Sequence, residues 1–219
     1  SVAMLILSEI NQQSERLVRV TRKLIKSIAF LVFPIAFLMI LIAEPMFYLF
    51  FKEKWLAAVP YFQVLTLGGM LLPFTIIFSE LFIAKERSVF FLGLEVIKGV
   101  LLFLLILLFF SKGILGLAIS WVVYMVITLL LSVIFSGKVI RYSLLQFVSD
   151  TFPYLFTAAI SVVTAYFVTR HVGEDILFIL VSVAVTGILY ITMCKLLGLE
   201  MTKEIDTWLN AKKENKSIE

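Results

Sequence analysis

Three charged residues, Glu80, Glu95 and Lys98, lie inside two neighbouring apolar stretches of this chain. Glu95 and Lys98 are three residues apart in an apolar run over residues 89–110, and Glu80 lies near the end of the preceding run, residues 58–84. Three residues correspond to about one turn of a helix, so Glu95 and Lys98 share one face. Because a short turn joins the two runs, Glu80 should lie at nearly the same depth as Glu95. The spacing therefore predicts one charge cluster.

Such a cluster permits two kinds of chemistry. A lysine near the centre of a membrane costs about 2.5–3.5 kcal/mol, so Lys98 should face a charged partner or a watery cavity. In one interpretation, Glu95 and Lys98 neutralise each other and only fix helix packing. In the other, Lys98 binds an anionic substrate in a cavity, and a carboxylate beside it takes up a proton. The residues alone leave both interpretations open.

A second group of cations precedes the first apolar run. Arg16, Arg19, Arg22 and Lys26 recur at spacings of three and four residues, which places them on one face of a helix. This ridge can act as a topology anchor at the membrane surface. It can also capture a lipid-linked phosphate at the cytoplasmic mouth of a cavity, with Arg16, Arg19 and Arg22 as the binding residues.

Enzymatic chemistry finds little support in the sequence. The single histidine, His171, is expected in a solvated loop, and the single cysteine, Cys194, is expected to pack near the end of a helix. The chain contains no spacing typical of a zinc site, a serine nucleophile or a phosphate-binding loop. We therefore predict no catalytic residue, no metal and no cofactor.

Apolar helices must position these charges. The chain is 62% hydrophobic and 16% charged, which is more apolar surface than a soluble domain of 219 residues can bury. About 20 residues cross the hydrocarbon layer, and a spanning segment must be a helix. The prediction is an all-α, polytopic integral membrane protein with six transmembrane helices, at about residues 24–51, 58–84, 89–110, 114–135, 153–169 and 176–197.

Basic residues in the connections predict the orientation. Of the 19 lysines and arginines, 14 lie around the start of the first run, around the end of the sixth run and in alternate gaps, whereas four lie in the other gaps. The remaining one, Lys98, lies deep inside a run. Cytoplasmic segments carry the excess of basic residues. Both ends of the chain are thus expected in the cytoplasm, with the helices in the cell (inner) membrane. Because the membrane topology accounts for the basic residues, we expect no nucleic-acid partner.

The runs and their connections suggest five parts. Residues 1–10 read as the end of an upstream helix, 11–137 as a lobe with four spans, and 138–150 as an interfacial linker helix. Residues 151–198 read as an additional helix pair, and 199–219 as a cytosolic tail. Pro34 and Pro73 lie within the first two spans, and both helices are predicted to be kinked.

One stretch resembles a known family. Glu44-Pro45 and the segment from Phe51 to Leu65, FKEKWLAAVPYFQVL, resemble the external loop and following helix of bacterial polysaccharide flippases. These transporters belong to the multidrug, oligosaccharidyl-lipid and polysaccharide exporter superfamily. Further similar motifs are residues 7–10, LSEI, and residues 94–98, LEVIK. The chain departs from the family pattern where Lys52 replaces a glycine, and Leu5 and Glu86 also differ.

The resemblance implies the C-terminal half of a flippase with fourteen helices. Its substrate would be a polyprenyl-diphosphate-linked oligosaccharide for surface polysaccharide or lipopolysaccharide synthesis, moved by alternating access between two lobes. Lys98 would then face the diphosphate, with Glu95 and Glu80 as its partners or as proton-coupling groups. The expected partners are this lipid-linked oligosaccharide, membrane lipids and an N-terminal lobe of the same polypeptide. A multidrug or cation exporter, a membrane enzyme acting on lipid-linked sugars and a scaffold remain as alternatives.

Overall fold

The computed structural model describes residues 14–84, 88–173, 175–204 and 206–207, and every regular element among them is a helix. The all-α prediction is confirmed for these residues. The elements are α2 (Ser14–Leu41), α3 (Ala43–Phe51), η1 (Glu53–Ala58), α4 (Val59–Gly69), α5 (Leu72–Ala84), α6 (Ser88–Phe109), η2 (Phe110–Lys112), α7 (Gly113–Ile140), α8 (Leu144–Thr169) and α9 (Asp175–Leu196).

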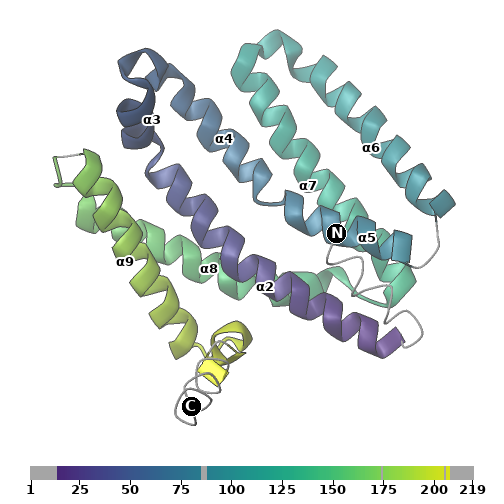
Figure 1. Ribbon diagram of the computed structural model, residues 1–219. Helices are drawn as coiled ribbons and strands as arrows, with labels where there is room; N and C mark the ends of the chain where they lie inside the picture. Colours follow the sequence, from purple (N-terminus) through teal and green to yellow (C-terminus); the bar gives the residue numbers. More distant parts are fainter. Residues whose placement is uncertain (1–13, 85–87, 174, 205, 208–219) are drawn as a thin grey trace, which may run out of the picture.

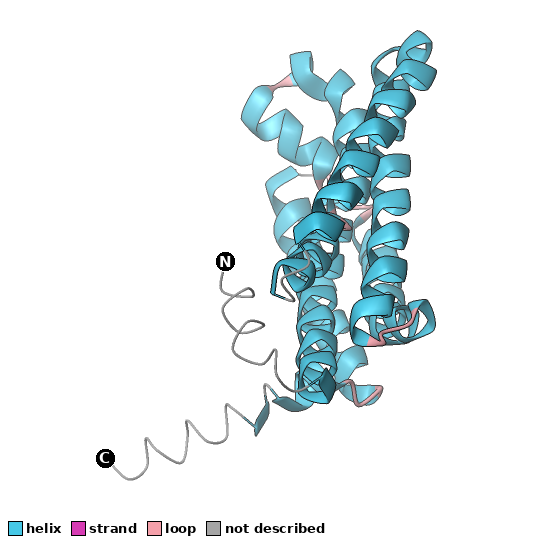
Figure 2. Cartoon of the chain, turned by 90° about the vertical axis from the view of Figure 1, so that its right-hand side faces the viewer, coloured by secondary structure: helices cyan, strands magenta, loops and turns pink. Residues whose placement is uncertain are grey.

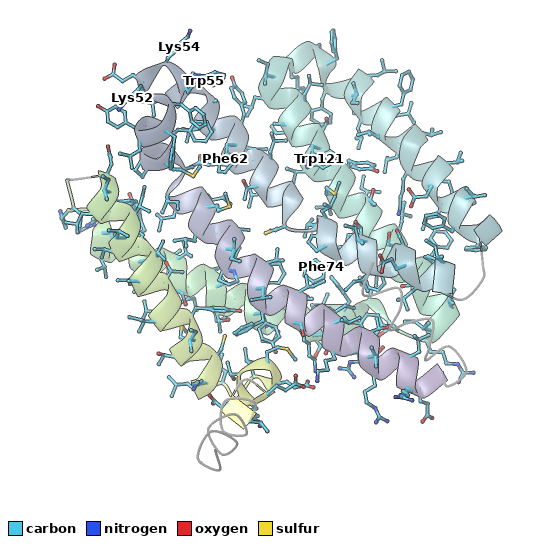
Figure 3. All side chains as sticks on the ribbon, in the orientation of Figure 1. Lys52, Lys54, Trp55, Phe62, Phe74 and Trp121 are labelled. Atoms are coloured by element: carbon cyan, nitrogen blue, oxygen red, sulfur yellow. The ribbon has the colours of Figure 1, made fainter. Side chains whose placement is uncertain are left out.

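The long helices run side by side and reverse direction at the two ends of the bundle (Figures 1 and 2). One end carries η1, η2 and the connection between α8 and α9. The other carries the start of α2, the end of α5 and the end of α9. Lys52, Lys54 and Trp55 mark the first end, whereas Phe74 lies deep in the bundle (Figure 3). Among the described basic residues, Lys52, Lys54, Lys112 and Arg170 lie at the first end, and those in the first turns of α2 lie at the other. Which end faces the cytoplasm remains a prediction.

Five segments of the described chain are long and apolar enough to cross a membrane: Glu15–Leu41, Glu53–Ile83, Phe90–Gly137, Leu144–Thr169 and Asp175–Leu196. The third contains 48 residues, and it includes two helices, α6 and α7, that fold back on each other around η2. The protein is therefore a multi-pass membrane protein. Six crossings, with α6 and α7 counted separately, remain a prediction.

Helix α2 continues through Pro34, and the kink predicted at this residue remains a prediction. A proline has no N–H to donate, so the carbonyl of Phe30, four residues earlier, loses its intrahelical partner. Tyr190 of α9 replaces that partner, because its hydroxyl donates to the Phe30 oxygen at 2.9 Å. The basic residues from Arg16 to Lys26 lie on the first turns of this same helix, so the cationic ridge and the first span form one element.

The second span is discontinuous. α4 ends at Gly69, and α5 begins at Leu72, one residue before Pro73. α4 packs closely on α7 at Gly68, where an added Cβ would lie 2.8 Å from the Trp121 side chain. A side chain at position 68 would push α4 off α7, so the glycine fixes where the upper half of this span packs.

The predicted linker helix over residues 138–150 is not a separate helix in the structure. Its first residues extend α7 to Ile140, and its last residues are the first turns of α8, so the fifth span begins at Leu144 and not at 153. Between them, Arg141 adopts a left-handed conformation, with φ 57° and ψ 40°. Ser143 then starts α8 with a capping box: its hydroxyl accepts from the Gln146 N–H, and the Gln146 side chain accepts from the Ser143 N–H.

Candidate functional site

The structure brings Lys98 and Glu95 together on α6. The Lys98 ammonium lies 2.8 Å from Glu95 Oε1, and the Lys98 side chain is 5% exposed, whereas that of Glu95 is 42% exposed. Lys98 lies on the same buried stripe as Leu94 and Leu105, the stripe along which α6 packs on the bundle. The carboxylate is thus the accessible member of the pair, and the ammonium is held inside the bundle.

Glu80, the third predicted member, lies on α5 and is half-buried. Helices α5 and α6 contact each other, but the membership of Glu80 in the cluster remains a prediction. Helix α7, which packs on both, carries buried hydroxyls at intervals of four or eight residues, at Ser120, Thr128, Ser132 and Ser136. Among the residues that the structure describes, the Thr128 and Ser132 hydroxyls find no hydrogen-bond partner. The interior of this helix group is therefore polar at several depths.

A second ionic centre joins the start of α2 to α8. Arg22 donates to both carboxylate oxygens of Asp150, with Nε and Nη2 each at 2.8 Å. The Tyr142 hydroxyl, from the turn between α7 and α8, donates to Asp150 Oδ2 at 3.0 Å. Lys26 lies 3.6 Å from Asp150 Oδ1 and also forms an ion pair with Glu200, which follows α9. One buried carboxylate thereby connects α2, α8 and the α7–α8 turn.

This arrangement divides the predicted cationic ridge. Arg16 and Arg19 are exposed, as a ridge facing headgroups requires. Arg22, in contrast, is held by Asp150, whose side chain is only 2% exposed. A bidentate bond to a buried carboxylate competes directly with binding of a lipid phosphate. The structure therefore leaves Arg16 and Arg19 as candidates for the cytoplasmic mouth and gives Arg22 a structural partner.

Burial and the neighbouring Asp150 carboxylate raise the pKa of the Tyr142 phenol well above its ordinary value. Both effects disfavour a phenolate, the first by removing water and the second by placing one negative charge beside another. Tyr142 is therefore a permanent hydrogen-bond donor to Asp150 over the physiological pH range.

The sequence interpretation did not identify Asp150, because the residue fell in the segment assigned to a linker. The signal was present in the helical period of small and polar residues. In α8 the buried face carries Asp150, Thr157, Ser161 and Thr169, together with Tyr154. This spacing of three, four and eight residues is typical of one helix face packed against protein in a membrane.

Two residues without a predicted role are placed as expected. His171 is exposed, and its Nε2 accepts from Arg170 Nε at 3.0 Å. Cys194 is buried near the end of α9, with its sulfur 3.7 Å from the Thr157 hydroxyl. Within the described ranges there is no group of three or more histidine, cysteine or acidic residues that could hold a metal ion.

The fold and the buried charges define a class: a multi-pass α-helical membrane protein with ionic groups inside its helix bundle. Comparison with known proteins finds partial similarity to one protein family and to one membrane protein. Residues 1–60 match a protein family described as "Polysaccharide biosynthesis protein". The chain is also 31% identical, over 134 residues, to an "Uncharacterized membrane protein in cps region" of Klebsiella pneumoniae.

That alignment covers 60% of this chain and 27% of the Klebsiella protein, so the chain spans about a quarter of the length of this relative. No solved structure matches the chain. The matched family residues end just after η1, and they therefore include the first described helices but neither Lys98 nor Asp150.

Proposed function

We propose that this chain is part of a transporter that moves a polyprenyl-diphosphate-linked oligosaccharide across the cell membrane for surface polysaccharide synthesis. The observation that carries the proposal is the interrupted span α4–α5, which packs on α7 in a bundle that also buries the charged side chain of Lys98. Transporters build their substrate sites from such interrupted helices near the bilayer midplane. The similarity of residues 1–60 to a family described as "Polysaccharide biosynthesis protein" supports a substrate from polysaccharide synthesis.

The geometry sets a condition for any role of Lys98 in binding. Its ammonium is buried and paired with Glu95, so a diphosphate can reach it only after α6 shifts and the pair opens. In our proposal the substrate diphosphate replaces the Glu95 carboxylate, which then becomes free to take up a proton. Bending at Met70 and Leu71, between α4 and α5, supplies the movement.

The test is translocation of a labelled polyprenyl-diphosphate glycan by the full-length protein in liposomes. Lys98→Met should reduce translocation at least about tenfold, because it removes the proposed counter-charge. The double variant Lys98→Met/Glu95→Leu removes the pair without leaving a lone carboxylate. If the double variant transports normally, the pair only fixes packing and Lys98 has no role in binding. Lys54→Met, at the exposed end of the bundle, is the matched control.

Export of a cation by the same kind of bundle is the second candidate. One observation favours it: Glu95, the carboxylate of the pair, is 42% exposed, while the ammonium is hidden. In that case Glu95→Gln would abolish transport and the double variant would also be inactive, and a fluorescent cationic drug would be transported in place of the glycan lipid. The same liposomes distinguish the two candidates.

A further inference from the structure

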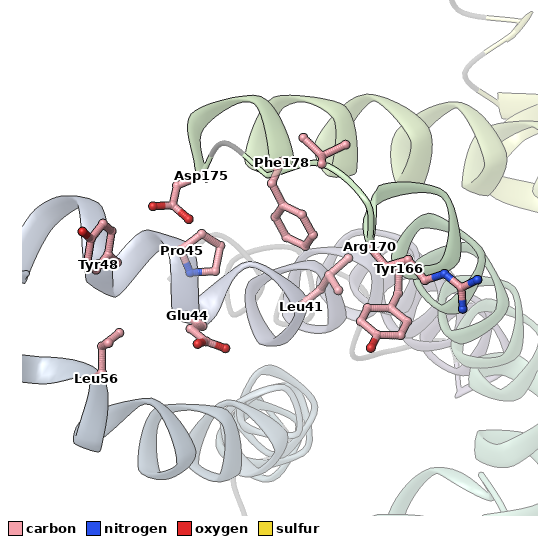
Figure 4. A pocket seen from close by; sticks show the side chains of 10 residues that line it. Leu41, Glu44, Pro45, Tyr48, Leu56, Tyr166, Arg170, Asp175 and Phe178 are labelled. Carbon is pink, nitrogen blue, oxygen red and sulfur yellow. The ribbon is translucent and has the colours of Figure 1, made fainter. Parts of the chain in front are cut away.

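A pocket opens at the end of the bundle opposite to Arg22, between α3, η1 and the connection from α8 to α9 (Figure 4). Its volume is about 450 Å³, and its polar and aromatic lining consists of Glu44, Tyr48, Tyr166, Arg170, Asp175 and Phe178. Small-molecule sites are typically about 300–1,000 Å³ and combine aromatic walls with a few polar groups. The pocket meets both conditions, and Lys98 and Glu95 do not line it.

The two carboxylates of the pocket are available to a ligand. Glu44 lies in the first turn of α3 and Asp175 in the first turn of α9, where the helix dipole favours an ionised carboxylate. Neither carboxylate has a hydrogen bond or an ion pair with any residue that the structure describes. Arg170 extends away from both in Figure 4; its guanidinium bonds to His171 and lies 5.7 Å from the Phe167 ring.

These groups select a chemical class of ligand. Ionised carboxylates accept hydrogen bonds from neighbouring hydroxyls, and such charge-assisted bonds are stronger than neutral ones. The rings of Tyr48, Tyr166 and Phe178 offer flat apolar faces beside them. Hydroxyls around the edge and an apolar face are the two features of a sugar ring. With two carboxylates and one guanidinium, the pocket carries a formal charge of −1, which disfavours a phosphate.

We propose that this pocket binds a neutral sugar ring of a glycan at the external surface. The external position follows from the predicted topology, and the identification of the glycan as transported substrate rests on the proposed function. A pocket at the exit would hold the sugar after its diphosphate has left Lys98. A free saccharide carries the same sugar ring as a lipid-linked glycan, so the experiment includes both kinds of ligand.

Binding is measured on the full-length protein in detergent by saturation-transfer NMR, with lactose and N-acetyllactosamine as free probes and a polyprenyl-diphosphate disaccharide as the linked probe. We expect Glu44→Gln, Asp175→Asn and Tyr166→Ala each to weaken binding about tenfold, which is the effect of losing one strong contact. Two control variants match these changes outside the pocket. Glu53→Gln alters another exposed carboxylate, and Phe156→Ala removes a ring of α8 with exposure similar to that of Tyr166.

The outcomes separate the pocket from the transport function. Unchanged sugar binding in all three pocket variants overturns the proposal, as does equal competition by polyprenyl diphosphate that carries no sugar. Loss of sugar binding in the pocket variants of a protein that translocates no glycan lipid supports the pocket and refutes the proposed function. Tighter binding of the linked probe than of free lactose identifies the lipid-linked glycan as the source, and equal binding identifies free saccharide.

Discussion

Asp150→Ala tests whether the buried ionic centre holds α2 against α8. The change leaves the Arg22 guanidinium and the Tyr142 hydroxyl without their common acceptor. Removal of one partner from a buried ion pair costs about 3–5 kcal/mol. The Arg22 side chain is 38% exposed and regains some hydrogen bonds from water, so we expect a loss of about 2–4 kcal/mol in the free energy of unfolding.

A double-mutant cycle assigns this loss to the pair itself. Arg22→Ala leaves the buried Asp150 carboxylate with the Tyr142 hydroxyl and the Lys26 ammonium as its remaining polar partners among the described residues. We expect this change to cost about 2–3 kcal/mol. In a protein that already lacks one of the two residues, removal of the other costs less free energy of unfolding. The double variant should therefore be more stable than the sum of the single losses implies, by about 1–2 kcal/mol.

Thermal unfolding of the full-length protein in detergent gives the comparison. Each kcal/mol corresponds to roughly 2–4 °C in Tm for a domain of this size, so a loss of about 3 kcal/mol predicts a decrease of roughly 6–12 °C. Asp206→Ala is the matched control, because Asp206 forms a 2.7 Å ion pair with Lys195 but its side chain is 44% exposed. Exposed pairs contribute little, and we expect its cost to stay below about 1 kcal/mol.

Two results would refute this reasoning. If Asp150→Ala and Asp206→Ala lower Tm equally, burial of Asp150 does not strengthen its interactions. If the losses from Asp150→Ala and Arg22→Ala are additive, the 2.8 Å contacts between these residues carry no coupling.

Three further predictions concern single residues. Lys52→Gly should stabilise the protein by about 0.5–2 kcal/mol in thermal unfolding, because Lys52 adopts φ 64° and ψ −176°, a conformation that strains any residue except glycine. Tyr142 stays protonated in the folded protein, where its pKa is raised. Its contribution to the free energy of unfolding should therefore be full below about pH 10 and should fall as the pH rises towards that raised pKa. Tyr142→Phe should flatten this alkaline loss in a pH series of Tm. Tyr190→Phe should cost about 1–2 kcal/mol, and clearly less in a Pro34→Ala background, where the restored N–H can bond to the Phe30 carbonyl.

For each of these three predictions, one result would contradict the reasoning. Lys54→Gly, two residues further in η1, should not stabilise, and an equal gain from both glycines would exclude backbone strain at residue 52. An alkaline loss of stability that is unchanged in Tyr142→Phe would mean that other groups cause it. An equal cost of Tyr190→Phe with and without Pro34 would show that the tyrosine does not compensate for the proline.

The apolar runs predicted the class of fold and most of its helices, because hydrophobic length is a property of local sequence. Helix ends were less predictable. The alternation of apolar and polar residues after position 138 suggested a surface helix, yet the spacing of Ser143 and Gln146 is that of a capping box and starts α8 at Leu144. The structure keeps α2 continuous through Pro34 because Tyr190, 156 positions away, accommodates the lost bond. Such long-range compensation cannot be read from local sequence.

The candidate site was likewise predictable from the sequence only where its contacts are local. The pairing of Lys98 with Glu95 depends only on the pitch of one helix and followed from their spacing. The partner of Arg22 is 128 positions away on another helix, so only the packing of α2 on α8 reveals it. Likewise, the resemblance to flippases implied a glycine where this chain has Lys52, and the backbone conformation of Lys52 is one that suits glycine.

The two ionic centres differ in a way that bears on movement. The Lys98–Glu95 pair lies within one helix, so this ion pair does not tie α6 to any other element. Asp150 instead connects α2, α8 and the turn before α8, so α2 and α8 cannot separate at this end without breaking its bonds. The interrupted span α4–α5 has two helical halves that can change their mutual angle at Met70 and Leu71. In the proposed transport cycle, movement should therefore occur in α4–α7, with α2, α8 and α9 as the fixed frame.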